Sequence, residues 1–457
     1  MANRRTASIA GIGARVRVVI GTAAGLAALG LWVVPAAHAA TINVTRGAVD
    51  AVANGNCSIR EAIKAANTDS AVDGCRAGSG ADRINAPGTF VLTMPDNDAN
   101  GLPVISSTIT ISSADISRDM GAQAFRIFAV ASTGDLTLKS VTVSGGLAAD
   151  CPNPGADVCG GGIANNGTLT VKGSRIVHNV ATTDSAFYVQ GGGIANSGTA
   201  TVMSSVVSGN SVTNAAPDFS IAAGGGVAND GTLEVRSSRI EGNTNSCSGP
   251  GSPFGCFALG GGIANDGMLN LTSSHVVENT TSCSGSSCAA VGGGSVNAIG
   301  TEATATVKSS RVNDNTASCS ASDCAAIGGG VGLFGTVTVA NSAVRGNIAS
   351  CSANGCFARG GGLDNNFDGT LNVNRSRVAH NAVNAPAGTA RGGGLYNGSG
   401  TSTLTSSAVT GNSASGATAE GGGIYEETGS VVLEKSRVSG NTPDDCAPPG
   451  SVPGCSN

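Results

Sequence analysis

The chain has 457 residues, 70 of them glycine, a formal net charge of −5 and only 12% charged residues. Ten Phe, three Tyr and one Trp are too few to fill a conventional globular core, whereas thin strands stacked on themselves need few large side chains. The acidic balance argues against a nucleic-acid-binding protein.

Residues 1–40 have the three-part layout of a secretory signal. Four arginines precede an apolar run over 18–34, and small residues at 37–39 suit a cleavage site. Cleavage removes those arginines and no acid, so the mature charge becomes 21 − 30 = −9. An uncleaved membrane anchor is the alternative, although three glycines interrupt the run. No later segment is apolar enough to span a bilayer, so we expect a secreted or surface-exposed protein.

Residues 41–80 are expected to cap one end of the fold. Ser58 and Glu61 have the spacing of a capping box, and an apolar stripe from Ile59 to Ala66 follows it. This pattern predicts a short amphipathic helix that lies across the exposed core of the first coil. Residues 81–159 are expected to form less regular coils.

A triple glycine recurs nine times over residues 160–441, at intervals of 29 to 36 residues. Its last residue is Gly162, Gly193, Gly226, Gly262, Gly294, Gly330, Gly362, Gly394 or Gly423. Apolar positions alternate within each copy, as at Leu169 and Val171, which is typical of strands, and Asn-x-Gly triplets such as 165–167 indicate tight corners. We expect three strands and three corners per copy, with a variable loop, in an all-β, right-handed parallel β-helix.

One asparagine occupies the same expected corner in every copy. These residues are Asn179, Asn210, Asn243, Asn279, Asn315, Asn347, Asn381, Asn412 and Asn441. If coils stack at about 4.8 Å, each amide can bond the amides above and below it. We therefore predict a structural asparagine ladder.

The fourteen cysteines form seven pairs of neighbours in the sequence. The pairs are Cys57/Cys75, Cys151/Cys159, Cys247/Cys256, Cys283/Cys288, Cys319/Cys324, Cys351/Cys356 and Cys446/Cys455. An even count in an exported chain favours disulfides, the last of which closes a tail over 442–457. Metal binding is the alternative, but the spacing and the four histidines do not suit it, and we expect no metal or cofactor.

Two motifs resemble those of known families. Residues 57–62, Cys-Ser-Ile-Arg-Glu-Ala, resemble the CSLREA motif of bacterial right-handed β-helix proteins, with Ile59 in place of leucine. The Gly-Gly-Gly-Ile elements and Ile176-x-x-Asn179 are similar to the GGAI and FxxN repeats of polymorphic outer-membrane proteins. The resemblance covers most of 41–445 and implies a secreted or surface protein, often taken to be an adhesin. Those outer-membrane proteins end in a membrane barrel, which we do not find before Asn457, so we do not expect autotransport.

Pectin-degrading enzymes have a pectate-lyase-like fold of this kind, so an enzyme is an alternative. A glycoside hydrolase needs two facing carboxylates, and a polysaccharide lyase needs an acidic calcium cluster with a basic proton acceptor. The related hydrolases use Asn-Thr-Asp, Asp-Asp and Gly-His-Gly elements on adjacent coils. Here residues 67–69 and 444–445 lie at opposite ends of the chain, and Gly-His-Gly is missing. We therefore predict no catalytic residues.

An arginine recurs in every second copy, directly after a serine. The residues are Arg175, Arg239, Arg311, Arg377 and Arg437, at a spacing of about 9.6 Å if coils are regular. They could bind an anionic glycan. The alternative, which we favour at this point, is a set of solubilising charges spaced to avoid repulsion between adjacent coils.

A second outward column changes character in the last three copies. It contains small residues in the early copies and then Asp364, Tyr396 and Tyr425, with Arg359, Arg391, Glu420 and Glu426 nearby. Stacked tyrosines flanked by charges could grip a sugar ring or a protein partner. Cross-strand packing and ordinary surface polarity are the alternative.

Together these features predict a non-enzymatic extracellular β-helix for adhesion or surface interaction, with a polysaccharide or a cell-surface protein as partner. A polysaccharide lyase or glycoside hydrolase, and a purely structural envelope component, remain alternatives.

Overall fold

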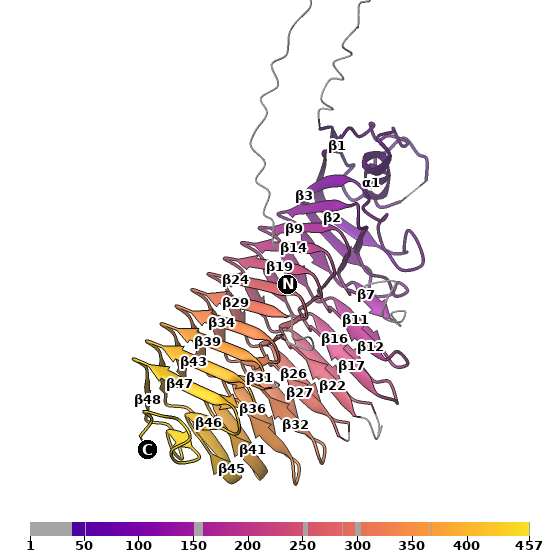
Figure 1. The fold of residues 1–457 in the computed structure, drawn as a ribbon. Coiled ribbons are helices and arrows are strands. Elements are labelled where there is room, and N and C mark those ends of the chain that lie inside the picture. Colours follow the sequence, from indigo (N-terminus) through magenta and orange to yellow (C-terminus); the bar gives the residue numbers. More distant parts are fainter. Residues whose placement is uncertain are drawn as a thin grey trace, which may run out of the picture. The chain divides into compact units, whose positions relative to one another are not determined.

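The computed structural model describes residues 39–456 except 51, 150–158, 250–254, 286, 298–302 and 367. Of the signal segment expected over 1–40, residues 1–38 lie outside the described residues. The described chain is a parallel β-solenoid, in which successive coils stack along one axis (Figure 1). Among the described residues, no helix is both long enough and apolar enough to cross a membrane.

The first coil is closed by the predicted helix, α1 (Ile59–Thr68). The side chain of Ser58 accepts from the Glu61 amide, and the Glu61 carboxylate accepts from the Ser58 amide at 2.9 Å, so the capping box is confirmed. Ile59 and Ile63 are fully buried in the core of the solenoid. Strand β1 (Thr41–Asn43) pairs in parallel with β2 (Asp82–Leu92) beside the helix.

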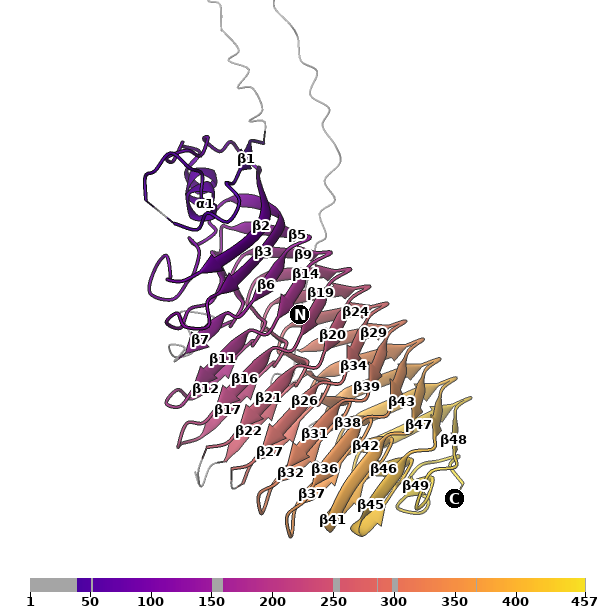
Figure 2. The same cartoon turned by 180° about the vertical axis from the view of Figure 1, so that it is seen from behind.

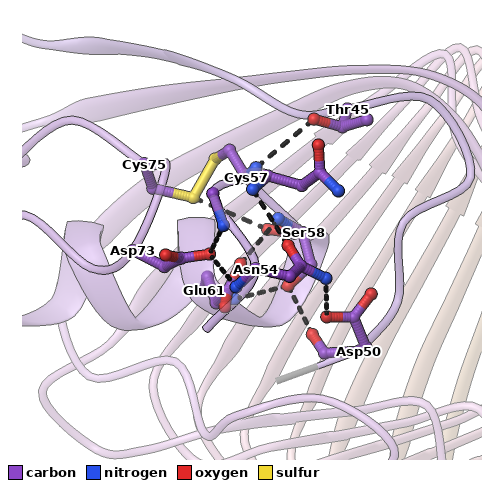
Figure 3. Close-up of a disulfide and its surroundings, with 10 residues drawn as sticks. Thr45, Asp50, Asn54, Cys57, Ser58, Glu61, Asp73 and Cys75 are labelled. Carbon is purple, nitrogen blue, oxygen red and sulfur yellow. Dashed lines mark hydrogen bonds between the residues drawn. A yellow bond between two sulfur atoms is a disulfide. The ribbon is translucent and has the colours of Figure 1, made fainter. Parts of the chain in front are cut away.

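A disulfide between Cys57 and Cys75 holds the segment that leads into this helix (Figure 3). The carboxylate of Asp73 accepts from the amide of Gly55 at 2.8 Å. The hydroxyl of Ser58 donates to the carbonyl of Asp50 at 2.5 Å. These bonds fix the entry to the helix, and the disulfide among them is the one that the sequence predicts.

Each later coil adds one strand to each of several columns, and the strands of a column pair in parallel (Figure 1, Figure 2). Two adjoining columns share one sheet. The first contains β5 (Asp135–Lys139), β9 (Thr168–Lys172), β14 (Thr199–Met203), β19 (Thr232–Arg236), β24 (Met268–Thr272), β29 (Thr304–Lys308), β34 (Thr336–Ala340), β39 (Thr370–Asn374), β43 (Thr401–Thr405) and β47 (Ser430–Glu434). The second contains β6 (Thr142–Ser144), β10 (Arg175–Val177), β15 (Val206–Ser208), β20 (Arg239–Glu241), β25 (His275–Val277), β30 (Arg311–Asn313), β35 (Ala343–Arg345), β40 (Arg377–Ala379), β44 (Ala408–Thr410) and β48 (Arg437–Ser439). Strands β2 and β3 (Thr108–Arg118) run through both columns.

A third column completes what we call the body. It contains β4 (Phe128–Val130), β8 (Ile163–Asn165), β13 (Ile194–Asn196), β18 (Val227–Asn229), β23 (Ile263–Asn265), β28 (Ser295–Asn297), β33 (Val331–Leu333), β38 (Leu363–Asn365), β42 (Leu395–Asn397), β46 (Ile424–Glu426) and β49 (Cys446–Ala447). Inward side chains such as Ile163, Leu169 and Ile176 are fully buried and form one continuous core.

The remaining strands form a separate sheet, which we call the arm. Outgoing strands are β7 (Leu147–Ala149), β11 (Val180–Thr183), β16 (Ser211–Asn214), β21 (Thr244–Cys247), β26 (Thr280–Cys283), β31 (Thr316–Cys319) and β36 (Ile348–Cys351). Returning strands are β12 (Tyr188–Gln190), β17 (Ser220–Ala223), β22 (Cys256–Leu259), β27 (Ala289–Val291), β32 (Ala325–Ile327) and β37 (Phe357–Arg359). Strands β41 (Ala382–Arg391) and β45 (Ser413–Glu420) run out and back without a break.

The arm corrects the expectation of three strands and a loop per copy. The segments expected as variable loops are the outgoing and returning strands, so a regular coil has five strands. Their inward side chains are small, as at Ala181, Ala258 and Ala290, and bury a thin core of their own. Alternation between alanine and serine is too weak a hydrophobic signal to indicate strands from the sequence.

The triple glycines lie where the arm returns to the body. A Cβ on Gly161 would stand 2.4 Å from the carbonyl oxygens of both Gly192 and Val180. A Cβ on Gly162 would meet the amide of Asn179 at 2.9 Å. Only glycine allows the backbones of neighbouring coils and the asparagine ladder to approach this closely.

The predicted asparagine ladder is confirmed. Asn179 Nδ2 donates to Asn210 Oδ1 at 3.0 Å, and bonds of 2.9 to 3.0 Å continue from coil to coil as far as Asn441. Two further ladders occupy the other corners. Asn165 Nδ2 donates to Asn196 Oδ1 at 2.6 Å, and Ser205 Oγ accepts from the Ser174 amide at 3.0 Å. The buried asparagine and serine side chains at the corners therefore form hydrogen bonds with their counterparts on the neighbouring coils.

Five predicted disulfides are present between described residues. They are Cys57–Cys75, Cys283–Cys288, Cys319–Cys324, Cys351–Cys356 and Cys446–Cys455. Cys159 is also disulfide-bonded, and its expected partner Cys151 lies outside the described residues. The predicted bond between Cys247 and Cys256 is wrong in this structure, because both are free, buried thiols. The two thiols hydrogen-bond to each other, and the sulfur of Cys247 also lies 3.3 Å from the hydroxyl oxygen of Ser220.

Candidate functional site

The predicted column of Asp364, Tyr396 and Tyr425 exists at the C-terminal end of the body. These residues are the central positions of β38, β42 and β46, which pair in register. Their neighbours Leu363, Leu395 and Ile424 enter the core, so the central side chains point away from it.

The arm brings the predicted charges to the same place. Arg359 ends β37, Arg391 ends β41 and Glu420 ends β45, and the three positions pair in register. Each lies directly before a triple glycine, so the chain passes at once from the charge to the column on the body. We call this set of contacts between arm and body the seam cluster: Phe357, Arg359, Asp364, Arg391, Tyr396, Glu420, Tyr425 and Glu427.

The two tyrosine rings of the seam cluster stack on each other. The ring centroids of Tyr396 and Tyr425 are 5.6 Å apart and their planes differ by 5°. The guanidinium of Arg359 lies 4.7 Å from the centroid of Tyr396, and that of Arg391 lies 4.6 Å from the centroid of Tyr425. Phe357 meets Tyr396 edge-on at 6.4 Å. Cation–π contacts and ring stacking thus join arm to body.

A buried ion pair lies beneath the rings. Arg359 Nε is 2.9 Å from Asp364 Oδ2, and the side chain of Asp364 is fully buried. Neither oxygen of Asp364 accepts a well-aligned hydrogen bond from any described residue. Burial raises the pKa of Asp364 to about 6, an effect that Arg359 opposes. The carboxylate is therefore held at a cost in desolvation that its partner offsets only in part.

The exposed edge of the seam cluster is charged. Arg391 Nε contacts Glu420 at 3.0 Å, and Arg391 Nη1 contacts Glu427 at 3.5 Å. The hydroxyl of Tyr396 donates to Glu427. Burial and this hydrogen bond raise the pKa of Tyr396. Arg391, Glu420 and Glu427 keep 25%, 38% and 42% of their side-chain surface exposed, so they are the groups that a partner can reach.

Glu426 does not join the cluster. It pairs in register with Asn397, so strand alternation turns its side chain to the opposite side from Tyr425. There it is buried at the C-terminal end of the asparagine column that begins with Asn165 and Asn196 and includes Asn397. Glu427, which the sequence analysis did not single out, makes the contacts instead. The alternation of side chains in β46 could have indicated this from the sequence, because residues 425 and 427 point to the same side and residue 426 points to the other.

The burial of the rings changes what the site can do. Tyr396 has no exposed surface and Tyr425 has 5%. A sugar ring therefore has no open aromatic face to stack on in this structure. The two tyrosines are therefore packing residues, and the side chains that a partner can reach are Arg391, Glu420 and Glu427.

The other predicted column, of arginines, is also in register. Arg239, His275, Arg311, Ala343, Arg377, Ala408 and Arg437 stack in that order along one edge of the body. Arg175 continues this column two coils before Arg239. Arg239 pairs with Glu241 on its own strand. In the part of the chain that the structure describes, no group of three potential metal-ligating side chains occurs.

Comparisons with protein-family models, with curated proteins and with solved structures find no match to this chain.

Proposed function

We propose that this chain is an exported, non-enzymatic protein for adhesion or surface interaction, which holds a polysaccharide or a cell-surface protein against the faces of its solenoid. The observation that carries the proposal is the register of outward side chains. Thr304, Thr336, Thr370 and Thr401, for example, occupy one column on successive coils. A rigid surface that repeats at about 4.8 Å suits a partner that is itself extended or repetitive.

Further features support export and a surface role. Stacked disulfides in the arm are compatible with an oxidising compartment. Residues 1–40 have the layout of a cleaved signal. The likeness of residues 57–62 and of the triple-glycine repeats to the CSLREA proteins and polymorphic outer-membrane proteins agrees with a right-handed solenoid and an adhesin role.

Within this proposal, the exposed edge of the seam cluster is one contact site. The stacked tyrosines hold Arg391 and Glu427 in place, so these side chains lose little conformational entropy when a partner binds. A polar partner with paired charges would match them.

The test is binding of the full-length protein to a glycan array and to whole cells. A variant with Arg391→Gln and Glu427→Gln should bind more weakly, whereas Lys139→Gln, an exposed change at the far end of the body, should not. Unchanged binding by the double variant would exclude this edge as a contact site. Turnover of any acidic or neutral polysaccharide in a parallel assay would overturn the non-enzymatic proposal.

A further inference from the structure

We propose that a groove along the C-terminal half of the body binds a linear acidic polysaccharide that carries one anionic group on every second sugar. This inference depends on the surface-interaction role proposed above, and it names the ligand class and the face. The groove follows the corner between the two columns of the shared sheet, from β29 and β30 to β47 and β48.

The groove has a volume of about 660 Å³. Five cationic side chains line it, Arg311, Arg375, Arg377, Lys435 and Arg437, and no acidic side chain does. All five residues are exposed. In a chain with a net charge of −5, this corner is a local concentration of positive charge.

Along the groove, coils with cationic lining residues alternate with coils whose lining residues are uncharged; Arg345, at the other end of β35, is exposed but does not line the groove. Arg311, Arg377 and Arg437 begin β30, β40 and β48, and Ala343 and Ala408 occupy the two intervening coils. Because coils stack at about 4.8 Å, successive charged coils are about 9.6 Å apart. The small alanine side chains leave space between the charged ones.

The second wall of the groove has the same alternation in its last three coils. Its residues adopt a positive φ at the corner, which directs them to the surface, and along the axis they read Ser309, Asn341, Arg375, Ser406 and Lys435. Arg375 and Lys435 thus lie on the same coils as Arg377 and Arg437. The neutral coils contribute exposed amide and hydroxyl groups at Asn341 and Ser406. Charged coils with two cations therefore flank a coil that can only donate and accept neutral hydrogen bonds.

The described part of the chain offers these cations no ion-pair partner. None of the five forms an ion pair with any described residue, whereas Arg239, earlier in the same column, pairs with Glu241. Arg377 makes one long contact of 3.5 Å, to the hydroxyl of Thr410. Glu434, next to Lys435 in sequence, accepts a hydrogen bond from Thr405 at 3.0 Å. Spaced solubilising charges would account for the neutral coils between the arginines, but not for two cations side by side on one coil, as at Arg375 and Arg377.

An acidic polysaccharide matches this pattern in chemistry and spacing. Guanidinium groups bind carboxylate or sulfate through paired hydrogen bonds, and hydroxyl and amide groups suit the neutral sugar between. Charged coils about 9.6 Å apart suit an extended polymer whose anionic groups recur on every second unit. No aromatic side chain lines the groove to stack on bases, which disfavours single-stranded nucleic acid.

The test uses the full-length protein and calorimetry with hyaluronan oligosaccharides, which carry one carboxylate per disaccharide. Neutral dextran and duplex DNA serve as comparison ligands. We expect hyaluronan to bind, dextran not to bind, and binding to weaken as salt rises. The variant Arg311→Gln/Arg377→Gln/Arg437→Gln should lose at least about tenfold in affinity.

A matched control removes three exposed cations outside the groove, with Arg83→Gln/Lys139→Gln/Lys172→Gln. It should bind hyaluronan within about twofold of the original chain, because the groove is intact. Equal losses in the two triple variants, equal binding of dextran, or equal binding of duplex DNA would overturn the inference. If no acidic polysaccharide binds but cells or other glycans do, the groove assignment fails and the proposed function stands. If nothing on the array or the cells binds, the proposed function itself fails.

Discussion

Tyr396 lies flat against Tyr425, one coil further along the body, with 5.6 Å between ring centroids and 5° between ring planes. The stack exists because the two residues are paired positions on β42 and β46. The guanidinium group of an arginine from the arm also lies over each ring. The relationship fixes the arm to the body at the last coils, which is where a partner would meet the charged edge.

Replacing Tyr396 should destabilise the C-terminal coils. Tyr396→Ala removes a fully buried ring and its contacts with Tyr425, Phe357 and Arg359, and should cost about 3 to 5 kcal/mol in the free energy of unfolding. Tyr396→Phe removes only the hydrogen bond to Glu427 and should cost about 1 kcal/mol. Urea unfolding, with hydrogen exchange resolved for β42 and β46, measures both. Equal costs for the two variants would contradict the importance of the stack.

Asp364 should make stability depend on pH. Its pKa is about 6 when folded, against an ordinary value of 3.8, so the folded state holds the extra proton between these values. Stability therefore falls as pH rises from about 4 through about 6, by roughly 3 kcal/mol for this group. Asp364→Asn has no group that titrates here. As pH rises over that range, the free energy of unfolding of the variant should therefore increase relative to that of the original chain.

Urea unfolding of both proteins at pH 4, 5, 6 and 7.5 gives the comparison. Only the difference between the two proteins is informative, because burial and Asp230 also raise the pKa of Asp266 to about 6. A constant difference across that series would mean that Asp364 does not titrate in this window.

The asparagine ladder should be intolerant of a gap. Asn279 Oδ1 accepts from the backbone amide and the side-chain amide of Asn243, and Asn279 Nδ2 donates to Ile240 and Asn315. Asn279→Ala would leave several of these buried groups unpaired, at about 1 to 3 kcal/mol each.

Hydrogen exchange should show faster opening of the coils on both sides of residue 279. Asn270→Ala, a change on the outward face of β24, is the matched control and should cost less than about 0.5 kcal/mol. Similar exchange in the two variants would show that the ladder contributes little.

Cys247 and Cys256 should behave as thiols. After denaturation without reductant, alkylation should label both, and should not label Cys283 or Cys288, which are bonded to each other. In a separate sample that has not been alkylated, oxidised glutathione should join the two thiols, which lose two protons and two electrons while glutathione disulfide is reduced to two thiols. Mass spectrometry of the peptides measures both states. Absence of labelling in the untreated protein would mean that the bond is already closed.

Features with a local cause could be predicted from the sequence. The capping box depends only on residues three apart, so Ser58 and Glu61 predict α1 correctly. The ladder from Asn179 to Asn441 follows from repetition, because identical positions on successive coils must stack. The column of Asp364, Tyr396 and Tyr425 was predictable for the same reason.

Other features depend on contacts between segments that no local pattern indicates. The arm consists of strands whose alanine and serine side chains give little hydrophobic contrast, and only its packing against itself explains them. The contacts of Arg359 with Tyr396 and of Arg391 with Tyr425 depend on how the returning strands of the arm meet the body. The groove depends on the stacking of coils, which places Arg375 and Lys435 beside the column of Arg311, Arg377 and Arg437 at one corner of the body. Repetition along the chain thus determined the coils and the columns of stacked side chains. The packing of the arm against the body decided which of those side chains are buried and which remain exposed to a partner, because contacts between distant segments are not visible in a local pattern.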